Sequence, residues 1–142
     1  MCGCFTATFE FSEIRVRWNL DRDLPLYKPR FNIALEQTSP TIPVIVHHKG
    51  GNECRLMQWG LIPHWAADPS IGNRMIIARA ETLTELRSFK HLVDRRRCII
   101  PADGFYEWRK EGKRKVPMWV QLRSREPFGA GWLVGRVAQT RR

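Results

Sequence analysis

The chain has 142 residues, which is one domain's worth of sequence and enough to bury a hydrophobic core without disulfides or a metal as support. Its net charge of +10, from 24 Lys and Arg against 14 Asp and Glu, must lie on the surface, so a polyanion is the natural partner. Nucleic acid is favoured over a membrane because no amphipathic basic helix is evident and the six Trp and seven Phe can stack on unpaired bases; a merely soluble basic protein is the alternative.

Targeting and metal signals are weak throughout the chain. No apolar run approaches the roughly 20 residues of a membrane span, so we expect a cytoplasmic protein with no membrane association. The cysteines contain no C-x-x-C pair, so we expect neither a zinc ribbon nor a disulfide framework, and no metal or cofactor; a four-thiolate site is the less favoured alternative, and its ligands would be Cys2, Cys4, Cys54 and Cys98. We expect a monomer.

The first half of the chain predicts short strands joined by loops. Residues 4–11 alternate like a strand, with Phe9 and Phe11 on one face, and Ser12 is a candidate cap for a short helix or turn. Four prolines between residues 24 and 43 exclude long regular elements, so this region is expected to be an extended loop. Residues 44–46 predict a short strand, and the turn Lys49–Asn52 leads into a partner strand at residues 54–59.

The second half predicts more strands and one helix. Residues 59–65 form an aromatic loop, too apolar for an ordinary exposed connection, and such a loop usually has a function or a pocket. We expect a strand at 74–82, a helix at 82–92, a strand with a Pro and Gly interruption at 98–108, and a strand at 116–122. After Pro127 the pattern degrades, and residues 136–142 read as a frayed basic tail. The sum is an α+β fold, predominantly antiparallel β with one or two short helices.

The start of the chain carries its most reactive pair of groups. Removal of Met1 would leave Cys2 with a free α-amine and a thiol, a 1,2-aminothiol in which both groups are partly nucleophilic near neutral pH. The amine can capture an aldehyde as a Schiff base, and the thiol can close it to a five-membered thiazolidine. The plain alternative is a disordered start with no chemical role.

Three other residues could carry chemistry. Alternation places Glu107 beside Phe105, and a carboxyl desolvated by aromatic rings is suited to transfer a proton, although an ordinary strand Glu is the alternative. Arg79 stands between small Ala78 and Ala80, so a phosphate or a base can approach it; the alternative is a cross-strand ion pair with Glu81 or Glu107. Only His64, of four histidines, lies in a pocket-like loop.

Five blocks in order resemble one family. Met-Cys-Gly at the start, 30–34 (RFNIA), 59–65 (WGLIPHW), 78–82 (ARAET) and 98–108 (CIIPADGFYEW) closely resemble the SOS-response-associated peptidase (SRAP) family. The resemblance runs from residue 1 to about residue 122. It is more specific than any single motif because five blocks occur at comparable spacing.

The resemblance implies a mostly β fold with a positively charged cleft. It implies binding of single-stranded DNA, removal of Met1 by the protein itself, and a thiazolidine crosslink between Cys2 and the ring-opened aldehyde of an abasic site, with peptidase-like and lyase-like chemistry in the DNA damage response. By resemblance, Cys2 is the nucleophile and Glu107 transfers protons. The residues implied to contact DNA are Arg79, Trp65, Pro63, His64 and Asn32.

The chain also departs from the family pattern. The family usually has Arg where this chain has Cys4, and it has Asn, which can hydrogen-bond the Cys2 amine, where this chain has Ile77. A C-terminal catalytic His of the family has no counterpart. We therefore expect a partial domain over residues 1–128 with an atypical tail over 129–142, truncated and with its sheet edges exposed. Impaired activity, a non-catalytic DNA-binding remnant and a fragment without a stable fold all stay open.

Overall fold

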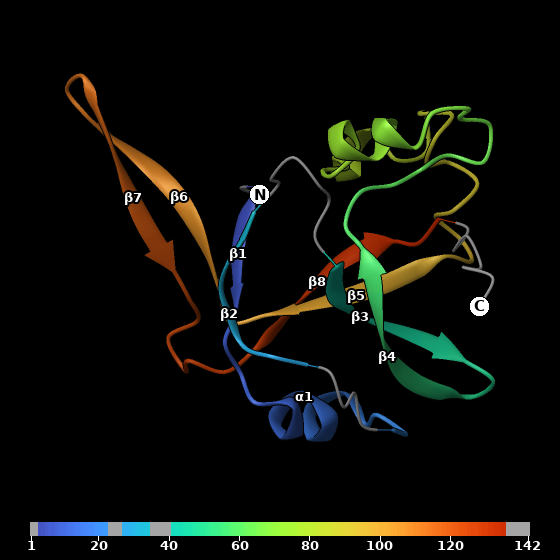
Figure 1. Ribbon diagram of the computed structural model, residues 1–142, viewed down its shortest axis with the longest axis horizontal. Helices are drawn as coiled ribbons and strands as arrows, with labels where there is room; N and C mark the ends of the chain where they lie inside the picture. The colour runs from blue at the N-terminus through green and yellow to red at the C-terminus, as the bar shows by residue number, and fades with distance from the viewer. Residues whose placement is uncertain (1–2, 23–26, 35–40, 136–142) are drawn as a thin grey trace.

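The part of the chain that the structure describes contains two four-stranded antiparallel sheets (Figure 1). The computed structural model describes residues 3–22, 27–34 and 41–135. One sheet has the order β2-β1-β6-β7 and the other β4-β3-β5-β8. The predicted α+β class, mostly antiparallel β with short helices, is confirmed. The elements are β1 Cys4–Ala7, α1 Phe11–Trp18, β2 Arg30–Ala34, β3 Thr41–His48, β4 Gly51–Gln58, η1 Pro69–Arg74, η2 Ala80–Thr82, β5 Arg97–Ala102, β6 Gly104–Glu111, β7 Arg114–Val120 and β8 Phe128–Leu133.

The helix α1 begins earlier than the sequence predicted. Glu10, not Ser12, is its N-cap residue, because Glu13 closes a capping box: its carboxylate accepts from the Glu10 backbone N–H at 2.8 Å, while the Glu13 N–H donates to the Glu10 carbonyl at 3.0 Å. The helix ends at Asn19, which adopts the left-handed conformation with φ 46°. Of its own residues only Ile14 is fully buried, and partly buried Phe11 and Trp18 also pack against the core.

The predicted hairpin at residues 49–52 is confirmed and is longer than expected. Strands β3 and β4 pair from Thr41 with Gln58 to His48 with Gly51. Lys49 and Gly50 both have positive φ, 50° and 85°, which is the geometry of a type I′ turn and matches the twist of the two strands.

Two strands lie where the sequence predicted loop. Strand β2 falls in the proline-containing stretch and is held because fully buried Ile33 pairs with Phe5 of β1. Strand β8 falls where the pattern degrades, and one of its glycines allows a close approach to β5: a Cβ at Gly129 would lie 2.6 Å from Ile99 Cγ2. In both cases pairing with a distant strand outweighs weak local propensity.

The prediction of a strand at residues 74–82 is wrong. Apolar and polar residues do alternate here, but among the described residues the segment pairs with no strand. Instead, η1 and η2 flank an irregular stretch, in which the Met75 carbonyl accepts a hydrogen bond from the Leu61 N–H at 3.0 Å. The helix predicted at residues 82–92 is present only as successive turns, including Leu86 N–H to Thr82 carbonyl at 3.1 Å. These turns bury Phe89 and Leu92 in a small apolar cluster with Leu61 and Leu133.

The stretch 98–108 divides at Asp103 into β5 and β6, which belong to different sheets. The Asp103 carboxylate, 9% exposed, accepts hydrogen bonds from the Thr6 hydroxyl at 2.5 Å, from the Thr8 N–H at 2.8 Å, and from the Thr8 hydroxyl. It thereby ties the first strand to the junction between the sheets. The main core lies between the sheets and includes Phe5 and Ile100.

None of the helices in the described ranges has both the length and the apolar composition needed to cross a membrane.

Candidate functional site

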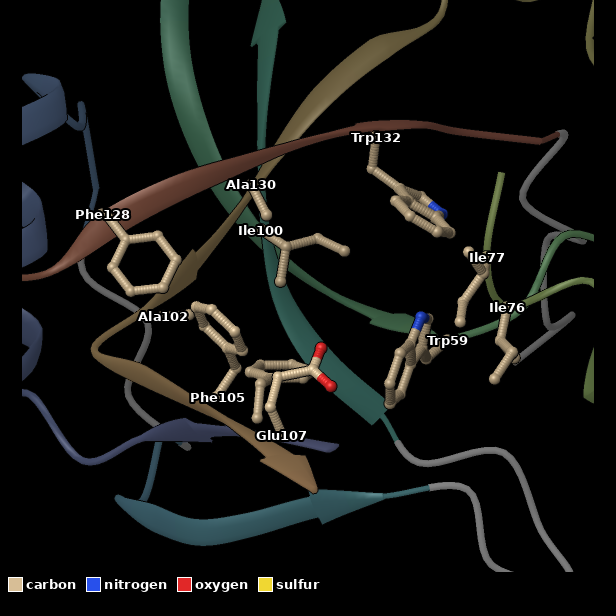
Figure 2. Close-up of a pocket in the computed structure, with 11 residues that line it drawn as sticks. Trp59, Ile76, Ile77, Ile100, Ala102, Phe105, Glu107, Phe128, Ala130 and Trp132 are labelled. Atoms are coloured by element: carbon tan, nitrogen blue, oxygen red, sulfur yellow. The ribbon is translucent and has the colours of Figure 1, made fainter. Parts of the chain in front are cut away.

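A cavity of about 410 Å³ opens between the two sheets (Figure 2). Its walls come from β1, β5, β6 and β8, from the end of β4, and from the irregular segment after η1. The lining side chains are apolar with one exception, a carboxylate. They are Phe5, Trp59, Ile76, Ile77, Ile100, Ala102, Phe105, Glu107, Phe128, Ala130 and Trp132.

Glu107 is the carboxylate of this cavity. Strand alternation in β6 brings it to the same face as Phe105, as the sequence predicted, and both line the cavity. Figure 2 shows its carboxylate directed into the space between the apolar side chains. The residue is exposed rather than desolvated, so it can exchange protons with solvent as well as with a bound molecule.

Trp59 supplies a hydrogen-bond donor that the sequence analysis missed. Its ring is only 6% exposed and meets Phe5 edge to face, with centroids 5.2 Å apart. Its indole N–H has no acceptor among the described residues, and Figure 2 shows the nitrogen turned to the side where Ile77 lies. A buried donor without an acceptor costs about 1–3 kcal/mol, so an oxygen bound in the cavity would recover this free energy. In the sequence, only the position of Trp59 at the start of the aromatic loop indicated that it could belong to the site.

The described start of the chain runs along the rim of the cavity. Phe5 of β1 lines it, and a Cβ placed on Gly3 would lie 3.7 Å from Cδ1 of Ile76, another lining residue. Cys2 itself lies outside the described residues. Gly3 therefore lies beside a residue that lines the same cavity as Glu107.

The aromatic loop at 59–65 divides between core and surface. Pro63 is buried, whereas His64 and Trp65 are exposed, the latter at 41%. His64 meets the His91 ring edge to face at 5.1 Å, and the Arg87 guanidinium carbon lies 5.4 Å from the centroid of the Trp65 ring. These exposed side chains of the loop and the residues they contact do not line the cavity.

Arg79 and Asn32 lie away from the cavity lining. Arg79 is the exposed N-cap of η2, and because its segment is not a strand, the cross-strand pairing with Glu81 or Glu107 considered for it does not occur. Its guanidinium makes no ion pair within the described parts of the chain. Asn32 is exposed in β2. Both are accessible to a ligand on the surface.

The described cysteines are spread over the two sheets. Cys4 lies in β1, Cys54 in β4 and Cys98 in β5. Burial raises the pKa of the Cys54 thiol to about 11 and that of Cys98 to about 12, so both are protonated at neutral pH and poor metal ligands. Within the ranges that the structure describes, no three His, Cys, Asp or Glu side chains are grouped as a metal site requires.

The sequence is similar to abasic site processing proteins from several organisms. It is 45% identical over 131 residues to "Abasic site processing protein YoqW" of Bacillus subtilis (strain 168) and 33% identical over 136 residues to "Abasic site processing protein YedK" of Escherichia coli (strain K12). Each match covers 90% of this chain and 57% of the relative. The chain therefore spans a little over half the length of these relatives.

The fold is also known from crystal structures. A protein from Bacteroides thetaiotaomicron superposes with a TM-score of 0.78 at 24% identity, over 92% of this chain and 58% of that one. The profile of the family described as "SOS response associated peptidase (SRAP)" matches residues 1–141. This match covers nearly the whole sequence, including the five blocks that suggested the resemblance. The chain belongs to the SRAP family.

Proposed function

We propose that this chain detects abasic sites in single-stranded DNA and captures them covalently through Cys2 after removal of Met1. The proposal rests mainly on Gly3, because a Cβ placed on it would lie 3.7 Å from Cδ1 of Ile76, a residue that lines the cavity together with Glu107. Cys2 is bonded to Gly3, and consecutive Cα atoms are about 3.8 Å apart, so the aminothiol is expected at the cavity rim.

The capture needs no oxidant or cofactor. Hydrolysis of the Met1–Cys2 peptide bond consumes one water and frees the α-amine. The amine attacks the aldehyde carbon of the ring-opened abasic sugar, and loss of one water gives an imine. The Cys2 sulfur then adds to the imine carbon while the thiol proton passes to the nitrogen, which closes the thiazolidine. Formation of the thiazolidine from Cys2 and the aldehyde therefore releases one water, counted apart from the water consumed in removing Met1.

Two residues of the cavity assist these steps in the proposed mechanism. Loss of water from the first adduct requires a proton donor and addition of the thiol requires a proton acceptor, and the Glu107 carboxyl can serve as both. The indole N–H of Trp59, which lacks an acceptor among the described residues, is placed to bind a hydroxyl or carbonyl oxygen of the sugar. The apolar walls limit the access of water, which would otherwise hydrolyse the imine.

The DNA strand is proposed to cross the exposed surface next to the cavity. Arg79 offers a guanidinium without an ion-pair partner in the described chain, and Trp65 offers a half-exposed ring. His64 is the exposed neighbour of Trp65 in the chain, whereas Pro63 is buried and would support the loop rather than reach far into the solvent. Exposed Asn32 is the remaining proposed contact. These residues would hold phosphates and bases around the lesion.

One feature of the cavity favours a second candidate function. Ile77 occupies the wall where the family resemblance implies an Asn for the Cys2 amine, and isoleucine can neither donate nor accept a hydrogen bond. A chain with this wall could bind single-stranded DNA through charge and aromatic rings without reacting. Such binding would depend on salt but neither on the abasic site nor on Cys2.

Denaturing electrophoresis with an abasic oligonucleotide distinguishes the two functions. The protein without Met1 is expected to form an adduct that survives denaturation, and Cys2→Ala is expected to form none. Cys4→Ala, which removes a thiol two residues away, is the matched control and should still react. Salt-dependent binding with no adduct would refute the covalent proposal and support the non-catalytic one.

A further inference from the structure

The cavity between the two sheets carries a charge opposite to that of the whole protein. The chain has a net charge of +10 from 24 Lys and Arg, yet among the described residues none of these side chains lines the cavity. The only charged side chain that does so in the described ranges is Glu107, and it forms no ion pair there. An unpaired carboxylate attracts a cation and repels the phosphates that the basic surface attracts. The charge of the cavity therefore favours a cationic occupant.

Aromatic rings surround this carboxylate. Five of the eleven residues that line the cavity are aromatic, and they come from β1, β6 and β8 and from the residue that follows β4. Figure 2 shows Phe128 on one side of the space and Trp59 and Trp132 on the other, with the Glu107 carboxylate directed between them. The five aromatic residues are Phe5, Trp59, Phe105, Phe128 and Trp132. A molecule beside the carboxylate would therefore also lie among rings.

Four of these rings form two edge-to-face pairs. Phe105 and Phe128 have centroids 6.3 Å apart with their planes at 83°, and Phe5 and Trp59 have centroids 5.2 Å apart with their planes at 79°. In such a contact the edge of one ring meets one face of the other, so the pairs leave most ring faces unused. The face of an aromatic ring is electronegative and attracts a cation within about 6 Å of the centroid. Rings and carboxylate therefore act on a cation in the same direction.

The size and the remaining walls of the cavity restrict the kind of cation. Its volume of about 410 Å³ lies within the range of about 300–1,000 Å³ that is usual for small-molecule sites. Ile76, Ile77 and Ile100 contribute aliphatic side chains that offer no hydrogen bond to a ligand. A strongly hydrated ammonium group or metal ion would lose water there without replacement, whereas a cation covered by methyl groups has no N–H to satisfy. The walls therefore favour an apolar organic cation.

We propose that the cavity binds a small organic cation of the quaternary ammonium class that also carries an apolar or aromatic group. The charged end lies beside Glu107 and the ring faces, and the apolar end lies against the isoleucine side chains. Cages of aromatic side chains are a recurrent means of recognising quaternary ammonium groups. This binding is non-covalent and does not depend on the chemistry proposed for Cys2.

Isothermal titration calorimetry with phenyltrimethylammonium chloride tests this proposal. Its uncharged carbon isostere, tert-butylbenzene, has the same shape without the charge, and benzoate supplies an aromatic anion. The cation should bind about fivefold more tightly than the isostere, which is the effect expected of cation–π attraction at a site open to water, and benzoate should bind least. Added salt should weaken binding of the cation by screening Glu107 and should not weaken binding of the isostere.

Two variants separate the contribution of the carboxylate from that of the rings. Glu107→Gln keeps the size of the side chain and removes its charge, so it should weaken binding of the cation about threefold and leave that of tert-butylbenzene unchanged. Trp132→Leu removes a ring and keeps an apolar side chain, so the cation should lose more affinity than the isostere. Glu111→Gln and Trp108→Leu are the matched controls, because neither residue lines the cavity, and both should bind normally. Thermal melts confirm that each variant folds.

Equal affinity for the cation and its isostere would overturn the proposal, because the cavity would then recognise only apolar surface. Equal losses in Glu107→Gln and Glu111→Gln, or tighter binding of benzoate than of the cation, would overturn it as well. Cys2→Ala should bind the cation as the unchanged chain does, and a loss of binding in this variant would also contradict the proposal. Because the titrations contain no DNA, this proposal and covalent capture by Cys2 can each fail alone.

Discussion

Replacement of Asp103 by Ala tests how the first strand is held at the cavity. The Asp103 carboxylate is nearly buried and accepts three hydrogen bonds, from the Thr6 hydroxyl and from the N–H and hydroxyl of Thr8. A hydrogen bond to a charged group contributes about 1.5–3 kcal/mol, but the hydroxyls can rotate to other acceptors, whereas the Thr8 N–H cannot. We therefore expect the free energy of unfolding to fall by about 3–4 kcal/mol.

Urea denaturation and thermal melting measure this effect. At roughly 3 °C per kcal/mol for a domain of this size, the melting temperature should fall by about 10 °C. Adduct formation should also slow below the melting range, because β1 carries the start of the chain to the cavity. The control Asp94→Ala removes an exposed carboxylate and should change stability by less than about 0.5 kcal/mol. A loss in Asp103→Ala no larger than this would refute the role assigned to the network.

Four further predictions concern the cavity and the buried thiols. Glu107→Gln should slow adduct formation about 100-fold or more in single-turnover gel assays without weakening DNA binding, and Glu111→Gln on the same strand should react normally; equal rates would contradict proton transfer by Glu107. Trp59→Phe removes the unpaired donor, so the adduct should form more slowly in the same assay; an unchanged rate would contradict a role of the indole N–H in holding the sugar. Ile77→Asn should speed adduct formation in the same assay, and a slower reaction would show that the apolar wall is needed. Because burial raises the pKa of Cys54 to about 11, the thiol stays protonated in the fold after it ionises in the unfolded chain. Its contribution to the free energy of unfolding should therefore be constant below about pH 9 and fall by about 1.4 kcal/mol per pH unit from there toward pH 11, so Cys54→Ala should lose stability less steeply with pH than the unchanged chain, as urea denaturation at each pH would show.

The sequence predicted the fold class, the central hairpin and the cavity carboxylate, because these depend on local patterns. Alternation alone places Glu107 beside Phe105, and a Gly-containing turn alone specifies the hairpin of β3 and β4. Strands β2 and β8 could not be predicted, since the first depends on pairing with β1 and the second on pairing with β5, where Gly129 allows close contact.

The candidate site shows the same division. Nothing local marks Trp59 as a buried donor without an acceptor, because that property arises only when two sheets close over its ring. The strand predicted around Arg79 failed because its alternating pattern had no partner strand to pair with. The exposed rings of Trp108 and Trp119 share a face only through the register of β6 and β7, which the sequence does not specify.

Intact mass spectrometry of the protein with an abasic oligonucleotide tests the central claim most directly. The protein alone should have lost the mass of Met1. After reaction, its mass should rise by that of the oligonucleotide less one water, and Cys2→Ala should show no such species. A retained Met1 with no added mass, or the same adduct on Cys2→Ala, would contradict covalent capture by the aminothiol of Cys2.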